Sequence, residues 1–169
     1  MTPATLSATP CPLWRRLLAL LYDLLAVVAI VMVVGLLCEL ATHGQLITTG
    51  AQTHIAWWYQ PLQGVVVAAY FLFSWRYGGQ TLGMRPWRIR VLAGNGAPVT
   101  WTQALLRLLV AAVPLLGLGL APWLGHRAAA WTVLLGWVLW FGVGLFDRQR
   151  RALHDLAAGT LVARLPTGG

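Results

Sequence analysis

Charged side chains are scarce in this sequence. Only 9% of the 169 residues are charged, and the twelve basic residues are all arginine, against four acidic ones. A soluble domain usually carries about 25% charged residues, whereas this chain is 59% hydrophobic. A net charge of +8 would suit nucleic acid, but a basic soluble protein would not have long uncharged apolar runs. The composition therefore favours a membrane protein and argues against nucleic acid as a partner.

Cysteine is also scarce, since only Cys11 and Cys38 are present. Cys11 precedes the first apolar run and Cys38 lies near its far end, so we expect the two thiols on opposite sides of a bilayer, without a disulfide. The N-terminal tail, residues 1–13, lacks the positive start of a signal peptide. The apolar run behind it is too long for a signal core, and no small-residue cleavage site follows. We therefore expect the first span to be retained.

Long apolar runs are what the sequence does have. Each of four runs reaches the roughly 20 residues that a helix needs to cross a bilayer core. They cover residues 17–38, 55–75, 104–123 and 128–146. None alternates polar and apolar residues as barrel strands do. The sequence predicts an all-α membrane protein with four transmembrane helices, in a domain of residues 14–163 followed by a short tail, 164–169.

The arginines divide unevenly between the predicted loops. Eleven fall before the first run, in or beside the loop after the second, or after the fourth, and only Arg127 lies between the third and fourth. Because basic residues accumulate on the cytoplasmic side of a membrane, we expect both termini in the cytoplasm. Several tryptophans lie near predicted boundaries as interfacial anchors. Trp137 and Trp140 lie deeper, where we expect them to face another helix.

Two segments that follow the second and fourth runs are similar to each other. They are "GGQTLGMRPWRIRVLAGNG" and "DRQRRALHDLAAGTLVARL", and aligning Leu82 with Leu153 also aligns Val91 with Val162. We expect both segments to lie at the cytoplasmic interface. Two interpretations remain open. Either a unit of two helices and one interfacial segment is duplicated about an axis along the membrane normal, or apolar sequences resemble one another by chance.

One carboxylate, Asp23, falls inside the first apolar run. It lies roughly 10 Å of helix rise beyond Arg16, and a charge at that depth is costly unless it pairs, faces the bundle interior or lines a water path. Arg107, at a similar depth in the third run, is a better-placed partner than Arg16. Three interpretations stay open for Asp23: an interhelical salt bridge, a carboxylate that handles a proton or cation, and a contact with a lipid headgroup.

The tail segment "FDRQRRALHDLAAGT" combines arginines with one helical face of alanine and leucine. This pattern is typical of a helix that lies in the headgroup layer while its arginines reach phosphates. We therefore expect Arg148, Arg150 and Arg151 to contact lipid headgroups, with anionic lipids of the cytoplasmic face as partners.

The same segment contains His154 and Asp155, a pair also found in metal hydrolases. A metal site would need more ligands on that side than the sequence supplies. We instead expect Asp155 to cap a helix or to hold an arginine such as Arg16 or Arg85. No nucleophile has a base and an orienting group beside it, and no glycine loop suits a phosphate. The sequence predicts no enzyme, no metal site and no cofactor.

Three stretches together resemble the RDD family, small bacterial membrane proteins named for one arginine and two aspartates. They are "RRLLALLYD", "GGQTLGMRPWRIRVL" and "RRALHDLAAGTLVAR". The resemblance runs from about residue 14 to 163 and implies that Arg16, Asp23 and Asp155 are the residues of the name. With Arg107 they form the predicted functional polar set. The chain departs from the family at a few motif positions, namely Met84, where lysine is frequent, Pro86, Trp87, Arg88 and Leu156.

The resemblance implies a bacterial cytoplasmic membrane but no settled activity, since most members have none established and some look like cation/proton exchangers. Our first hypothesis is ion or proton-coupled transport with Asp23 as the exchanging carboxylate. Because four helices make a thin pathway, it implies a homo-oligomer. The alternatives are a non-catalytic scaffold or assembly partner of another membrane protein, with structural Arg–Asp pairs, and an anionic-lipid-binding protein.

Overall fold

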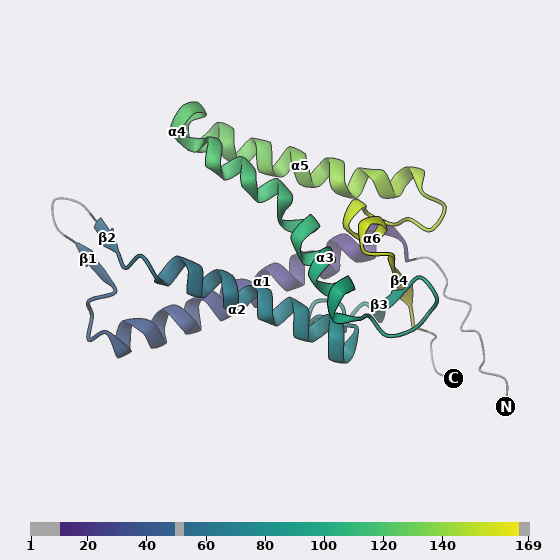
Figure 1. The fold of residues 1–169 in the computed structure, drawn as a ribbon, viewed down its shortest axis with the longest axis horizontal. Coiled ribbons are helices and arrows are strands. Elements are labelled where there is room, and N and C mark those ends of the chain that lie inside the picture. The colour runs from purple at the N-terminus through teal and green to yellow at the C-terminus, as the bar shows by residue number, and fades with distance from the viewer. Residues whose placement is uncertain (1–10, 50–52, 166–169) are drawn as a thin grey trace.

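A computed structural model of the chain describes residues 11–49 and 53–165, and it is mostly helical. The helices are α1 (Leu13–Ala41), α2 (Tyr59–Phe73), α3 (Trp101–Ala112), α4 (Ala121–Leu124), α5 (His126–Phe146) and α6 (Leu153–Ala157), with a π turn η1 (Ser74–Gly78) and a 3₁₀ helix η2 (Val113–Leu120). Two antiparallel strand pairs join β1 (Ile47–Thr49) to β2 (Thr53–Ile55) and β3 (Ile89–Ala93) to β4 (Thr160–Arg164). Figure 1 places these pairs at opposite ends, which we call the hairpin end (β1–β2) and the ribbon end (β3–β4).

The helices run back and forth between these two ends. α1 leaves the ribbon end and α2 returns to it; α3, η2 and α4 then lead away from it, and α5 returns (Figure 1). The two helix pairs diverge from the ribbon end, where the starts of α1 and α3 and the ends of α2 and α5 come together. The ribbon end is therefore the place where residues far apart in the sequence meet.

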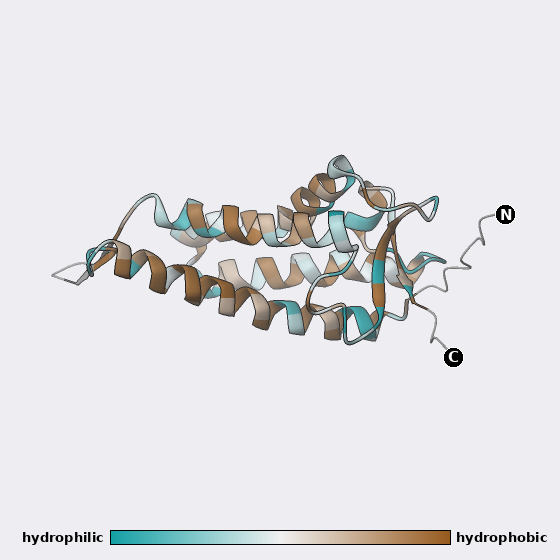
Figure 2. Cartoon of the chain, turned by 90° about the horizontal axis from the view of Figure 1, so that it is seen from below, coloured by the Kyte–Doolittle hydropathy of each residue, from teal (hydrophilic) through white to brown (hydrophobic). Residues whose placement is uncertain are grey.

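Three helices are long and apolar enough to cross a membrane. They are α1, the continuous run Trp101–Leu124 formed by α3, η2 and α4, and α5. Only 11% of the most apolar window of α1 is buried, and 17% of each of the other two. Since shielding a Leu or Val side chain from water is worth about 1.5–3 kcal/mol, so much exposed apolar surface indicates lipid as the surrounding medium. Figure 2 shows hydrophobic residues along these helices.

The second predicted span, 55–75, is displaced in the structure. Ile55 belongs to β2, so the helix begins only at Tyr59, and α2 has 15 residues. It passes directly into η1, which carries the helical path to Gly78. Gly79 then ends it with φ of 64°, a left-handed conformation that glycine adopts readily. Three candidate spans are thus confirmed, and the fourth stays a prediction.

The third predicted span, 104–123, contains a change of helix type that the sequence analysis did not anticipate. Pro114 has no N–H to donate, and the α-helix gives way at Val113 to η2, which is a tighter 3₁₀ helix. The indole N–H groups of Trp137 and Trp140 donate to carbonyls of the preceding α3, at 3.2 and 3.0 Å. This confirms that both tryptophans face another helix.

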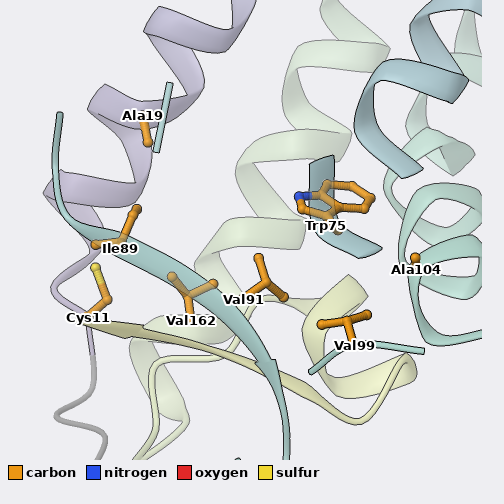
Figure 3. Packing of buried hydrophobic residues seen from close by; sticks show 8 residues of the cluster. All are labelled: Cys11, Ala19, Trp75, Ile89, Val91, Val99, Ala104 and Val162. Atoms are coloured by element: carbon orange, nitrogen blue, oxygen red, sulfur yellow. The ribbon is translucent and has the colours of Figure 1, made fainter. Parts of the chain in front are cut away.

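The two segments predicted at the interface pair with each other as the β3–β4 ribbon. Val91 lies opposite Val162 in its register, and these are the residues that the sequence alignment had matched. Ile89, Val91 and Val162 are buried against the ends of the helices, with Trp75 and Ala104 in the same cluster (Figure 3). The prediction of an all-α protein therefore holds for the three candidate spans. It is wrong for this ribbon and for the β1–β2 hairpin, where pairing between strands satisfies the backbone.

Candidate functional site

Asp155 lies at the centre of a buried charge cluster at the ribbon end. It stands in α6 with 0% exposure and forms ion pairs with Arg16 of α1 and Arg107 of α3. The backbone N–H of Ala152 donates to the same carboxylate at 3.0 Å. This hydrogen bond caps the N-terminus of α6. We call Arg16, Arg107 and Asp155 the arginine clamp, because they tie two long helices to the C-terminal segment.

Further contacts fix both guanidinium groups. Arg107 donates to the hydroxyl of Thr160 at 3.0 Å, and its guanidinium carbon lies 5.0 Å from the centre of a Trp75 ring. Arg16 donates to the backbone carbonyl of Arg150. With side chains 6% and 3% exposed, the two arginines depend on these partners, because an unpaired buried charge is costly.

The clamp contains two cations and one anion. Burial alone would raise the pKa of Asp155, but the guanidinium groups of Arg107 and Arg16 outweigh it and hold the pKa below its usual range. His154 lies beside the carboxylate, where burial and the nearby Arg107 lower its pKa to about 3. The imidazole is therefore neutral at pH 7, and the cluster keeps one excess positive charge.

Asp23 has a separate set of partners, all of them neutral. Its carboxylate accepts hydrogen bonds from the Tyr70 hydroxyl at 2.9 Å, the Thr81 hydroxyl at 2.5 Å and the Gly83 N–H at 2.9 Å. The Leu82 N–H donates in turn to the Tyr70 hydroxyl at 3.0 Å. Asp23 is only 4% exposed. We call Asp23, Tyr70, Thr81 and Gly83 the Asp23 cluster.

Gly83 allows the close approach that builds this cluster. A Cβ atom at position 83 would overlap the carbonyl oxygen of Ala19 and lie 2.7 Å from the Asp23 amide nitrogen. Real Cβ atoms essentially never come within 3.0 Å of such atoms. The segment that follows η1 is thus pressed against α1, and a side chain at position 83 would separate the donors from the carboxylate.

The predicted polar set divides into these two clusters. The structure brings Arg16, Arg107 and Asp155 together, and it confirms Arg16, rather than Arg85, as an arginine held by Asp155. The predicted pairing of Asp23 with Arg107 is wrong, because Asp155 and Thr160 bind that guanidinium. Within residues 11–49 and 53–165, Asp23 forms no ion pair.

The neutral partners of both clusters were missed from sequence. Tyr70 is a hydroxyl group in an otherwise uncharged apolar run, and Thr81 and Gly83 stand in the quoted "GGQTLG" stretch. Thr160 ends the "AGT" in the quoted stretch "RRALHDLAAGTLVAR". A search for opposite charges overlooks these neutral groups. The signal that could have found three of them is a hydroxyl group inside an apolar run or a quoted motif.

The three arginines predicted to contact headgroups have different surroundings. Arg148 and Arg150 are exposed. Arg151 bonds Asp147 through Nε and Nη2, at 3.0 and 3.1 Å, and these bonds lower the pKa of Asp147 to about 2. Lipid contact by the three stays a prediction. Across the described ranges, no three His, Cys, Asp or Glu side chains gather in a way that could hold a metal ion.

The long apolar helices meet at the ribbon end, where the arginine clamp joins them. This arrangement defines the class of the molecule as a helical membrane protein. The sequence model of the RDD family matches residues 10–159, so the chain belongs to the RDD family. The matched range contains both aspartates and both arginines of the two clusters. The curated proteins and the solved structures compared with the chain gave no match.

Proposed function

We propose that this protein couples the movement of an ion or proton across the cytoplasmic membrane to exchange at Asp23, acting as a homo-oligomer. One observation carries the proposal: Asp23 is a buried carboxylate whose three partners are all neutral donors. Asp155, by contrast, is compensated by two arginines. A buried carboxylate without a fixed counter-charge is stabilised most by binding a proton or a cation. Buried carboxylates in membrane proteins typically serve ion or proton paths.

A four-span topology with both termini in the cytoplasm is part of this proposal. α2 and η1 together give 20 helical residues, about 30 Å at 1.5 Å per residue, which matches a bilayer core. The arginine-rich segments meet at the ribbon end, which therefore faces the cytoplasm by the positive-inside rule.

The ribbon register also supports a duplicated unit. Under the alignment that matches Val91 with Val162, residue 90 matches 161 and residue 92 matches 163. The register pairs Arg90 with Ala163 and Leu92 with Leu161. If each residue is replaced by its match in the other copy, the first pair becomes the second and the second becomes the first. Antiparallel strands related by a two-fold axis have this property, as expected for repeats about the membrane normal.

The test is ion flux into proteoliposomes under imposed pH and cation gradients. Wild type should show coupled flux, Asp23→Asn should abolish it, and Asp147→Asn should leave it unchanged as a matched carboxylate control. Asp23→Glu keeps the acid but moves it, so it should retain part of the flux. An inactive wild type across several cations and both gradient directions would refute transport.

The arginine clamp favours a second candidate, a non-catalytic scaffold or assembly partner. Its ion pairs are buried within the chain. Buried pairs of this kind would hold the helices in a fixed arrangement to which another membrane protein could bind. The scaffold proposal expects Asp23→Asn to reduce stability while wild type carries no flux. It also expects a second membrane protein to co-purify with wild type and to be lost in Asp155→Asn.

A further inference from the structure

We propose that the cleft between η1 and the start of α3 binds the phosphate of an anionic lipid headgroup. The cleft has a volume of about 280 Å³ and is lined by Arg76, Pro98, Val99, Thr100 and Trp101. Arg76 comes from η1, whereas the other four belong to the segment that enters α3. The site is distinct from the tail arginines at 148, 150 and 151.

Arg76 is the cation of this cleft. Its Nε atom is buried and has no hydrogen-bond partner in the described part of the chain. Its guanidinium carbon lies 5.8 Å from the Tyr77 ring centre, a contact that leaves the guanidinium N–H groups available. Arginine suits phosphate because its planar donors can bind two oxygens at once.

No Asp or Glu side chain forms an ion pair with Arg76 in residues 11–49 and 53–165. Of its four acidic residues, Asp23 is held by neutral donors, Asp155 by the arginine clamp and Asp147 by Arg151. The fourth, Glu39, lies in the last turn of α1, at the hairpin end. None of these four side chains therefore neutralises Arg76, and a lipid phosphate supplies the charge that could.

The start of α3 adds donors to the same cleft. Thr100 and Gln103 satisfy each other in a capping box, at 3.1 and 3.3 Å. The backbone N–H groups that open α3, beginning with that of Trp101, have no acceptor within the helix itself. Free amides at the positive end of a 12-residue helix attract an anion already positioned by Arg76.

Aromatic side chains beside the cleft favour a lipid over free phosphate. Phe73, Tyr77 and Trp101 form mutual ring contacts with centres 5.5 to 5.9 Å apart. They are 53%, 73% and 44% exposed. Exposed aromatic rings at the ends of apolar helices lie at headgroup level, so the cleft opens at the depth where lipid phosphates are found. The inference uses the membrane location and does not depend on transport at Asp23.

The experiment is native mass spectrometry of the full chain released from detergent with phosphatidylglycerol or phosphatidylcholine. Arg76→Gln should weaken phosphatidylglycerol binding about tenfold, the effect of losing a charge-assisted hydrogen bond. Arg76→Lys should recover part of it. Arg85→Gln removes the same charge from an exposed position in the segment between η1 and α3, outside the lining of the cleft, and should have a much smaller effect. Equal losses in Arg76→Gln and Arg85→Gln would overturn the site in favour of general charge attraction.

A second arm separates the source of the phosphate and controls for folding. Inorganic phosphate at millimolar concentration should not displace the lipid from wild type. If it does, or if Arg76→Gln alters phosphate binding while leaving lipid binding unchanged, the site takes free phosphate and the lipid assignment is wrong. Thermal unfolding of Arg76→Gln should match that of Arg85→Gln. A larger loss of stability, with Arg76→Lys unable to restore lipid binding, would mean that Arg76 is structural and would also overturn the proposal.

Discussion

Replacing Asp155 by asparagine is the sharpest perturbation of the arginine clamp. The side chain keeps its size and can still accept the Ala152 N–H that caps α6. It loses the charge that compensates Arg16 and Arg107, whose side chains are 6% and 3% exposed. The variant therefore confines two guanidinium groups to one buried site without a counter-ion.

The expected cost follows from that arrangement. Removing one partner of a buried ion pair typically costs about 3–5 kcal/mol, because the remaining charge is left uncompensated. Arg107→Gln should cost less than Asp155→Asn, since it leaves Arg16 and Asp155 as a balanced pair. Combining Asp155→Asn with Arg107→Gln should recover part of the loss, because only one uncompensated cation remains.

The assay is reversible unfolding by a denaturing detergent, followed by circular dichroism, for the three variants and Asp147→Asn. Asp147 forms its ion pair at the surface with Arg151, where such pairs contribute little. The reasoning is refuted if Asp155→Asn loses no more stability than Asp147→Asn. It is also refuted if the double variant is less stable than Asp155→Asn alone.

Three further predictions concern the Asp23 cluster, the pH response and the topology. Gly83→Ala should destabilise the protein and separate the donors from Asp23, whereas Gly64→Ala, which meets open space, should not; thermal unfolding of both checks this. Below pH about 6.5 the unfolded chain protonates His154 while the folded chain does not until about pH 3. The free energy of unfolding should therefore fall with falling pH by up to about 1.4 kcal/mol per unit, and a His154→Asn variant should flatten that slope. Alkaline phosphatase, which is active only outside the cytoplasm, should be active when fused after Gly44 and inactive after Asn95, and the reverse result would invert the proposed topology.

The sequence predicted the spans because hydropathy follows directly from the solvent. A bilayer demands about 20 apolar residues per helix, and the runs that became α1, α3 to α4, and α5 meet that demand. The ribbon was missed because its pairing joins segments about 70 residues apart, and neither segment has a strand pattern strong enough to show this alone. Pro114 was visible in the sequence, but the sequence alone does not determine whether the helix bends, breaks or changes type at a proline.

The candidate site was predicted in its charged members, but not in its neutral ones, and only partly in its pairings. Charges inside a membrane span must be compensated, so Asp23 and Arg107 stood out, whereas the family resemblance pointed to Arg16 and Asp155. How these residues pair depends on where α6 packs against the helices. The depth of a residue along its span does not determine that position. Asp23 was assigned the wrong partner because hydroxyl and backbone donors can satisfy a carboxylate without leaving a charge pattern in the sequence.

Proton release on cation binding tests the central claim most directly. Purified protein in a weakly buffered detergent solution is titrated with alkali cations at a series of pH values, and the bulk pH is followed. If Asp23 exchanges a proton for a cation, wild type should release up to one proton per chain and Asp23→Asn should release none. No release from wild type with any cation, or equal release from Asp23→Asn, would contradict exchange at Asp23.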